Sequence, residues 1–271
     1  MIKNSRKNVI RNLADSISAH YGGIPISLED IIEDENLNVF YDSYELNTFD
    51  GMTVYDKKHF FIHLNIDKGN FAGSERGRFT LAHELGHYFI DSHRIGLKKG
   101  LLKPHPSKFN LKQHAEIEQE ANYFASCLLM PEKQFKEEIY KHKLKFNGKF
   151  NVELINILKD KFRVSKSACA IRFSEIGNCP IMIIYAIQDE IKWIIYSEDF
   201  PFKYLISDKV PPRSMVIGEF FEKRTEDAYK TIPIWAVDCF KDVNIKTDIQ
   251  RKLFEYCITY KGYAMSILWE D

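Results

Sequence analysis

The stretch RFTLAHELGHYFIDSHR, residues 78–94, places His83, Glu84 and His87 inside an apolar run that is typical of a buried helix. On an α-helix, residues i and i+4 differ by about 40° in azimuth and lie about 6 Å apart along the axis. His83 and His87 can therefore point imidazole nitrogens at one ion, at roughly 2.0–2.1 Å for zinc. Glu84, rotated by about 100°, can take a proton from a metal-bound water and pass it to a leaving amine. Gly86 permits close approach of another segment to this helix.

The alternative for this motif is a pair of surface histidines on an ordinary amphipathic helix. An H-E-x-x-H match in a chain of this size arises by chance at roughly the few per cent level. The flanking residues are apolar: Phe79, Leu81, Ala82, Leu85, Tyr88, Phe89 and Ile90. Because buried histidine and glutamate side chains need partners or a metal, these flanks favour the metal site.

A zinc site with two histidines needs a third protein ligand and a position open to water. The predicted helix HAEIEQEANYFASCLLMP, residues 114–131, offers Glu116, Glu118 and Glu120. Glu118 lies about 60° from the centre of the apolar face, Glu120 lies about 100° away, and Glu116 lies farther still. This phase predicts that Glu118 faces inward and that Glu116 and Glu120 face solvent. Asn122, one turn after Glu118, is expected to hydrogen-bond a ligating side chain.

The sequence RFTLAHELGH, followed by E-x-E-A-N-x-F-A-x-x-L-L-M-P, resembles the ImmA/IrrE family of zinc metallopeptidases. Both motifs match in the family's order and separation, and the resemblance is strong over roughly residues 40–131. It implies one Zn²⁺ per chain in a gluzincin-like site, with His83, His87 and Glu118 as ligands and Glu84 as the catalytic acid and base. The family's characterised activity is site-specific cleavage of a repressor that controls a mobile element or a stress response.

The resemblance thus predicts a zinc endopeptidase that cleaves a partner regulatory protein, of which a helix-turn-helix transcriptional repressor is the expected type. The alternative is a non-catalytic regulator that keeps the zinc fold and acts by binding a repressor or DNA. A Glu84→Gln variant separates the two, because only the peptidase needs the proton transfer. Either strand Met52–Tyr55 or strand Phe60–His63 is expected to hold an extended substrate by strand addition.

Composition favours a cytoplasmic protein over a secreted or membrane protein. The 271 residues carry no formal net charge, so nothing global points to nucleic acid or to an anionic membrane. The N-terminus lacks an apolar signal region, and no run reaches the roughly 18 apolar residues of a membrane helix. The cysteines form no C-x-x-C pair, which argues against a disulfide framework and a cysteine zinc site: Cys127, Cys169, Cys179, Cys239 and Cys257.

The pattern along the chain predicts an α+β protein with three parts. Residues 1–131 are expected to form the zincin-like metallopeptidase domain, residues 132–178 a helical, helix-turn-helix-like segment, and residues 179–271 a small α/β domain. One branch of the ImmA/IrrE family resembles this layout, and there the last part is a GAF-like domain. By that resemblance alone, the C-terminal domain is expected to be sensory.

Local patterns predict the elements within these parts. A helix is expected over residues 5–20, strands over 51–55 and 59–65 with a tight turn between them, and a loop over 92–112. Ser74 is expected to open the HELGH helix. Beyond residue 179, the patterns predict two hairpins, PIMIIYAI with IKWIIYS and KLFEYCITY with KGYAMSILWE, a strand at TIPIWAVD and a short helix near SMVIGEFFEK.

Some polar residues have weaker functional signals. Lys166 and Arg172, on the second helix of the middle segment, are candidate contacts to DNA phosphates. The favoured interpretation of that segment is a helical bridge that packs on the peptidase domain. His93, His105 and His114 are expected in or beside loops, as solvent-facing or packing residues. His114 or Tyr123 is a candidate hydrogen-bond donor to the oxyanion formed during peptide hydrolysis.

Overall fold

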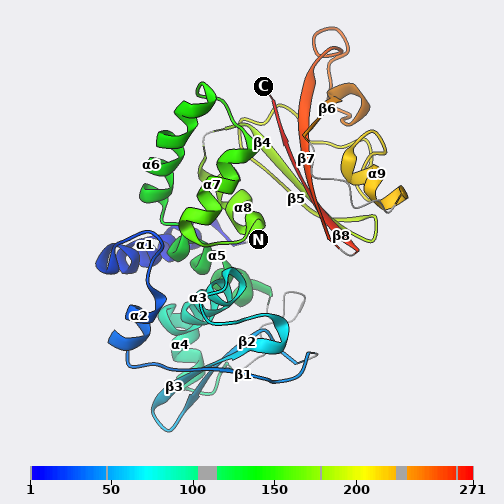
Figure 1. The fold of residues 1–271 in the computed structure, drawn as a ribbon. Helices are drawn as coiled ribbons and strands as arrows, with labels where there is room; N and C mark the ends of the chain where they lie inside the picture. The colour runs from blue at the N-terminus through cyan, green and yellow to red at the C-terminus, as the bar shows by residue number, and fades with distance from the viewer. Residues whose placement is uncertain are drawn as a thin grey trace. The chain divides into compact units, whose positions relative to one another are not determined.

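The computed structural model of the chain describes residues 2–46, 48–102, 115–177, 179–223, 231–260 and 262–270. Within these ranges the chain is a mixture of helices and two sheets (Figure 1), as the α+β prediction requires. It divides into two compact units, one formed by Met1–Phe135 and Leu158–Ser165, the other by Lys136–Ile157 and Lys166–Asp271. Residues 132–178, predicted as a separate segment, contribute to both units. None of the described helices is long and apolar enough to cross a bilayer.

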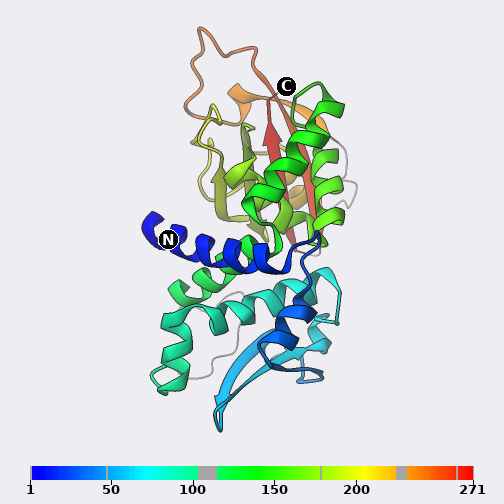
Figure 2. The ribbon, with the colours of Figure 1, turned by 90° about the vertical axis from the view of Figure 1, so that its left-hand side faces the viewer.

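The first unit opens with helices, continues with a small sheet and returns to helices (Figure 2). Its elements are α1 (Asn4–Tyr21), α2 (Leu28–Asp34), β1 (Asn38–Asp42), β2 (Gly51–Asp56), β3 (His59–Asn65), the 3-10 helix η1 (Ile66–Lys68), α3 (Glu75–Phe89), α4 (Asp91–Lys98) and α5 (Ala115–Leu129). Two further helices, α6 (Glu132–Lys143) and α7 (Val152–Phe162), each have residues in both units. Helix α1 and strands β2 and β3 confirm the helix and the two strands predicted for this region.

The sheet of the first unit has the strand order β1-β3-β2, with β1 parallel and β2 antiparallel to β3. A two-residue turn joins β2 to β3. Lys57 and Lys58 both have positive φ there, which matches the twist of the two strands. Ile62 and Leu64 alternate onto the buried face of β3, and α3 packs against β2 and β3.

The edges of this sheet are β1 and β2, whereas β3 is hydrogen-bonded to a strand on each side. A strand paired on both sides has no row of backbone groups left for an added peptide. Residues Phe60–His63 lie in β3, so their predicted role in strand addition was wrong. Residues Met52–Tyr55 lie in β2, which among the described strands pairs with β3 alone, so their role in strand addition stays a prediction.

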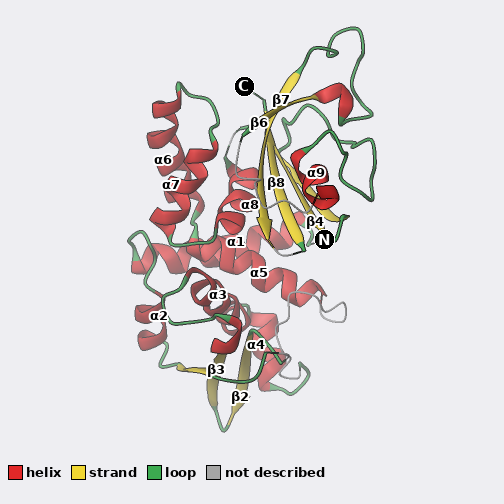
Figure 3. Ribbon diagram, turned by 45° about the vertical axis from the view of Figure 1, so that its right-hand side comes forward, coloured by secondary structure: helices red, strands yellow, loops and turns green. Residues whose placement is uncertain are grey.

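Helix α3 begins where the sequence predicts. Ser74 has extended backbone angles, and its Oγ accepts a hydrogen bond from the amide of Gly77 at 2.9 Å. This cap satisfies one of the first amides of the helix. Helix α3 packs against the sheet and against α5 (Figure 3). Gly86 is needed for the second contact, because a Cβ there would lie 3.2 Å from both Ala121 Cα and Phe124 Cδ1.

Helix α4 differs from the prediction, since residues 92–112 were expected to form a loop and Asp91–Lys98 is helical. The residue before the helix, Ile90, makes no side-chain capping bond, so the usual sequence signal of a helix start is missing. Gly96 inside the helix further weakens its local propensity. Space explains this glycine, because a Cβ there would lie 3.0 Å from Leu102 Cβ. Residues 103–112 lie outside the described part of the chain.

The second unit is built around an antiparallel sheet in the order β5-β4-β8-β7-β6. Its further elements are η3 (Leu144–Phe146), α8 (Lys166–Ile176), β4 (Ile181–Ile187), β5 (Glu190–Tyr196), α9 (Val216–Lys223), β6 (Ile232–Trp235), η4 (Ala236–Asp238), β7 (Lys252–Tyr260) and β8 (Tyr263–Trp269). The pairs β4–β5 and β7–β8 confirm the two predicted hairpins, and α9 confirms the predicted short helix.

Helices α8 and α9 lie on opposite sides of this sheet (Figure 1). On the α9 side, Ile184 and Leu268 join a buried apolar cluster with Phe220. Glu255 of β7 is also buried there and accepts hydrogen bonds from the amides of Val216 and Ile217 at 2.6 and 3.0 Å. These bonds pair amides at the start of α9 with a carboxylate, which the helix dipole favours. Burial raises the pKa of Glu255 despite them.

Helix α8 carries the two side chains predicted as DNA phosphate contacts. Arg172 is only 1% exposed and donates a hydrogen bond to Glu175 at 3.2 Å. Lys166 donates to the hydroxyl of Tyr256 on β7 at 3.1 Å and lies over the tyrosine ring. A buried guanidinium cannot reach a duplex phosphate, so Arg172 is excluded as a candidate DNA contact, whereas the favoured interpretation of the segment as a helical bridge did not depend on it. Lys166 is held against the sheet of its own unit.

Candidate metal centre

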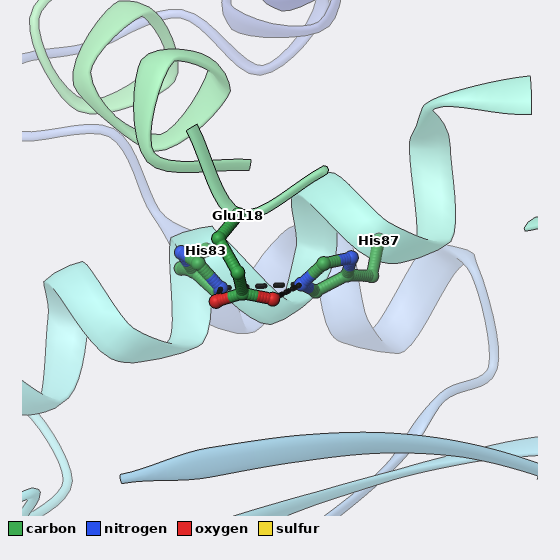
Figure 4. A group of neighbouring side chains, drawn as sticks. All are labelled: His83, His87 and Glu118. Carbon is green, nitrogen blue, oxygen red and sulfur yellow. Dashed lines mark hydrogen bonds and ion pairs between the residues drawn. The ribbon is translucent and has the colours of Figure 1, made fainter. Parts of the chain in front are cut away.

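Two histidines of α3 and one glutamate of α5 point toward one another (Figure 4). The Nε2 atoms of His83 and His87 are 3.2 Å apart. Glu118 places Oε2 3.3 Å from His83 Nε2 and Oε1 3.4 Å from His87 Nε2. These three residues form a group whose candidate ligand atoms lie within 4.8 Å of one another. The fold thus brings together, from two helices, the three residues that the sequence predicts as ligands.

The spacing of these donors is compatible with one bound metal ion. Donors about 2.0–2.1 Å from a tetrahedral zinc ion lie about 3.3 Å from one another. The two imidazole nitrogens are 3.2 Å apart, and each faces a different oxygen of Glu118, at 3.3 Å for His83 and 3.4 Å for His87. Two imidazoles and one carboxylate are also a donor set that catalytic zinc sites use. His83, His87 and Glu118 therefore offer a donor set whose chemistry fits one zinc ion, and one ligand atom of each lies within 4.8 Å of the others.

The two imidazoles are buried, and their surroundings shift their pKa values in opposite directions. Burial lowers the pKa of His83, but the hydrogen bond to Glu118 and the charges of Glu84 and Glu118 outweigh burial and leave that pKa raised. For His87, burial dominates and lowers the pKa to about 3. The two nitrogens are 3.2 Å apart, so a charge on His83 also lowers the pKa of His87. At neutral pH His87 is therefore uncharged and offers a lone pair to a metal.

Asn122 supports the cluster from one turn beyond Glu118 on α5. Its Oδ1 accepts a hydrogen bond from His83 Nδ1 at 2.9 Å. With the proton on Nδ1, the lone pair of neutral His83 lies on Nε2, the nitrogen that faces Glu118. Supporting bonds of this kind orient a ligating imidazole and fix its tautomer. The helical phase of α5 therefore lets Asn122 hydrogen-bond one of the three candidate ligands, as the sequence predicts.

Glu84 is fully buried between α3 and the edge strand β2. Thr53 donates a hydrogen bond from Oγ1 to Glu84 Oε2 at 2.7 Å. Gly51 leaves room for the carboxylate, because a Cβ there would lie 2.6 Å from Glu84 Oε1. The charge of Glu84 raises the pKa of His83. Gly51 and Thr53 could not be predicted as neighbours of Glu84, because no motif in the sequence links β2 to α3.

Glu120 is buried, although the sequence analysis expects it to face solvent. Its exposure is 7%, and its carboxylate pairs with Arg6 of α1 and with His93 of α4. The expectation failed because α5 is covered by α1 as well as by α3, so its buried surface is wider than the apolar stripe. Glu116 is exposed, as predicted. In the sequence, nothing near residue 6 marks Arg6 as a partner of α5.

Of the remaining candidate residues, the structure describes His93 and Tyr123. His93, expected in or beside a loop, is buried in α4, and its ring centroid lies 5.2 Å from that of His87. His105 and His114 lie outside the described residues, so the role considered for His114 stays a prediction. Tyr123 is half-buried on α5, with the Lys7 ammonium 5.1 Å from its ring centroid.

Comparison with known proteins agrees with the motifs. A solved structure described as a Mycobacterium tuberculosis transcriptional regulator has a similar fold, with a TM-score of 0.62 and 15% sequence identity, covering 98% of this chain and 78% of that chain. No curated protein sequence matches the chain. The family model of the IrrE N-terminal-like domain, peptidase M78, matches residues 33–174, which is just over half of the chain and includes the HELGH helix and Glu118. The chain therefore belongs to the family of IrrE N-terminal-like domains, peptidase M78.

Proposed function

We propose that the chain is a zinc-dependent endopeptidase in which His83, His87 and Glu118 hold one zinc ion and Glu84 transfers protons. The observation that carries this proposal is the convergence of two imidazoles and one carboxylate, whose ligand atoms lie within 4.8 Å of one another, with the two nitrogens 3.2 Å apart, close to the roughly 3.3 Å edge of a zinc tetrahedron. Membership of the peptidase M78 family supports the same chemistry. When bound, zinc would polarise a peptide carbonyl and lower the pKa of water.

The surroundings of Glu84 suit its carboxylate for transferring a proton in the proposed site. Its carboxylate is buried, and Thr53 fixes one of its oxygens through a 2.7 Å hydrogen bond. A carboxylate in this setting takes a proton from the attacking water and delivers it to the leaving amine nitrogen. Gly51 preserves the space that the carboxylate occupies. Helix α3 and strand β2 therefore position one general acid and base.

The edge strand β2 is the proposed binding element for the substrate. Extended peptides add to exposed sheet edges through backbone hydrogen bonds. Residues Met52–Tyr55 lie on such an edge, and Thr53 and Gly51 on the same strand contact or border Glu84. A peptide paired with β2 would thus run beside the residue that transfers the proton.

We further propose that the substrate is a regulatory protein, of the helix-turn-helix repressor type. The similar fold of a protein described as a transcriptional regulator supports a role in regulation. The burial of Arg172 and the contacts of Lys166 with Tyr256 weigh against direct DNA binding through α8. The GAF-like and sensory character of the C-terminal unit stays a prediction, as does the cytoplasmic location.

Metal removal tests the proposed function. Purified full-length protein, loaded with one equivalent of zinc, is incubated with a repressor encoded by the neighbouring reading frame, and new termini are identified by mass spectrometry. We expect cleavage at one site, loss of cleavage after treatment with 1,10-phenanthroline, and recovery when zinc is restored. Cleavage that continues undiminished in metal-free protein would contradict a metal-dependent mechanism.

A further inference from the structure

Beside the metal-binding triad lies a buried charged group that the peptidase mechanism does not use. Arg6 of α1 holds the carboxylate of Glu120 at both oxygens, with Nε 2.8 Å from Oε1 and Nη2 2.5 Å from Oε2. His93 of α4 donates from Nε2 to Glu120 Oε2 at 3.1 Å. We call Arg6, Glu120 and His93 the Arg6 cluster. It joins three helices, α1, α4 and α5, through one carboxylate.

The Arg6 cluster touches the metal site at two points. The ring of His93 lies against the ring of His87, with centroids 5.2 Å apart and planes inclined by 36°. Glu120 stands two residues after Glu118 on the same helix, so the clamp on Glu120 also fixes the rotation of α5 about its axis. A rotation of α5 would move Glu118 away from the histidine nitrogens.

A simple structural ion pair would not need this arrangement. Exposed ion pairs contribute little to stability, whereas Glu120 is buried and its two oxygens are both engaged. Two-point pairing between a guanidinium and a carboxylate fixes direction as well as distance. Arg6 adds a third bond from Nη2 to Ser92 Oγ at 2.8 Å, which ties the start of α4 to the same point. The position of His93 is therefore set from two sides.

We propose that the Arg6 cluster is a positioning device for the metal site: it holds the His87 ring and the Glu118 carboxylate in the orientation that binds zinc tightly. This inference rests on the proposed metal site at His83, His87 and Glu118. Neither Arg6 nor His93 is one of the three grouped donors, so their effect would pass through His87 and Glu118. Groups that orient metal ligands typically change metal affinity by about 10–100-fold when they are removed.

Two variants separate the parts of the cluster. Arg6→Met keeps a long aliphatic side chain and removes the guanidinium that clamps Glu120. His93→Phe keeps a ring beside His87 and removes the hydrogen bond to Glu120. Arg11→Met is the matched control, because Arg11 lies on the same helix, pairs with Glu132 at 3.3 Å, and has the same 33% side-chain exposure as Arg6.

The experiment is a zinc titration of each full-length protein against a chromophoric chelator, together with the visible absorption spectrum of the cobalt-loaded form. We expect Arg6→Met and His93→Phe to weaken zinc binding by about 10–100-fold and to shift the cobalt spectrum. Arg11→Met should leave affinity and spectrum unchanged, which separates ligand orientation from a general loss of stability.

Wild-type affinity and an unchanged cobalt spectrum in both Arg6→Met and His93→Phe would overturn this inference while leaving the metal site intact. An equal loss in Arg11→Met would also overturn it, because the effect would then be general. Glu118→Ala in the same titration reports on the metal site itself. If that variant binds zinc as the wild type does, the proposed site has failed, and the inference fails with it.

Discussion

Replacing Glu84 by glutamine is expected to reduce peptide cleavage by about 10²–10⁴-fold, the usual contribution of general acid–base catalysis. Glutamine has the shape of glutamate and can still accept the hydrogen bond from Thr53 Oγ1, which now reaches Glu84 at 2.7 Å. It cannot take up the proton of the attacking water. Because Glu84 is not one of the three grouped donors, the variant should keep its metal. Cleavage rates are measured on zinc-loaded wild-type and variant protein at equal metal content.

A Glu116→Gln variant is the control for this experiment, because Glu116 is exposed on α5. The variant protein should cleave the substrate at the wild-type rate. Equal rates in wild type and Glu84→Gln would exclude the catalytic role. A Glu84→Gln protein that also retains its regulatory effect would favour the alternative, a zinc-fold regulator that acts by binding a repressor.

Alanine in place of Glu118 should weaken zinc binding by more than the roughly 100-fold that follows removal of a merely supporting group. Glu118 supplies the carboxylate that faces both histidine nitrogens, at 3.3 and 3.4 Å. Without it, two imidazoles remain, and a zinc ion loses one of its three protein ligands. Affinity is measured by competition with a chromophoric chelator, and cleavage is measured in parallel.

Glu116→Ala provides the comparison on the same helix, two residues away and exposed; its unfolding free energy should change by less than about 0.5 kcal/mol. If Glu116→Ala lost the zinc and Glu118→Ala kept it, the helix would be in a different phase from the one described. Glu120→Ala is expected to weaken zinc binding as well, because it leaves Arg6 and His93 without their shared carboxylate.

Helical periodicity accounts for how much of the candidate site the sequence reveals. The spacing of His83 and His87 predicts that their nitrogens converge, and the structure places them 3.2 Å apart. The phase of the apolar residues in α5 distinguishes Glu118 from Glu116. Period and phase are local properties of the sequence, so they can be evaluated before the fold is known.

Contacts between distant segments explain what the sequence could not reveal. The helical phase wrongly predicted that Glu120 faces solvent, because Arg6, 114 residues earlier, supplies a partner from α1. Thr53 and Gly51 border Glu84 only because β2 is the strand beside α3. Helix α4 was missed because Ile90 gives no capping signal. Each of these features depends on which elements meet, and periodicity within one element does not carry that information.

For the fold as well, local patterns were predictable from the sequence and long-range pairings were not. Strands β2 and β3 were predicted from their alternation and a short polar turn, and the register confirms the hairpin. The parallel pairing of β1 with β3 and the order β5-β4-β8-β7-β6 depend on long-range connections. Arg172 looked like a surface cation by residue type, yet it is buried beside Glu175.

The most direct test of the metal site is the zinc content of purified wild-type and His83→Ala protein, measured by elemental analysis and native mass spectrometry. His83 Nε2 lies 3.2 Å from His87 Nε2 and 3.3 Å from Glu118 Oε2, so alanine removes one of the three grouped donors. We expect one zinc ion per wild-type chain and almost none in His83→Ala. A full equivalent of zinc in His83→Ala would contradict this expectation.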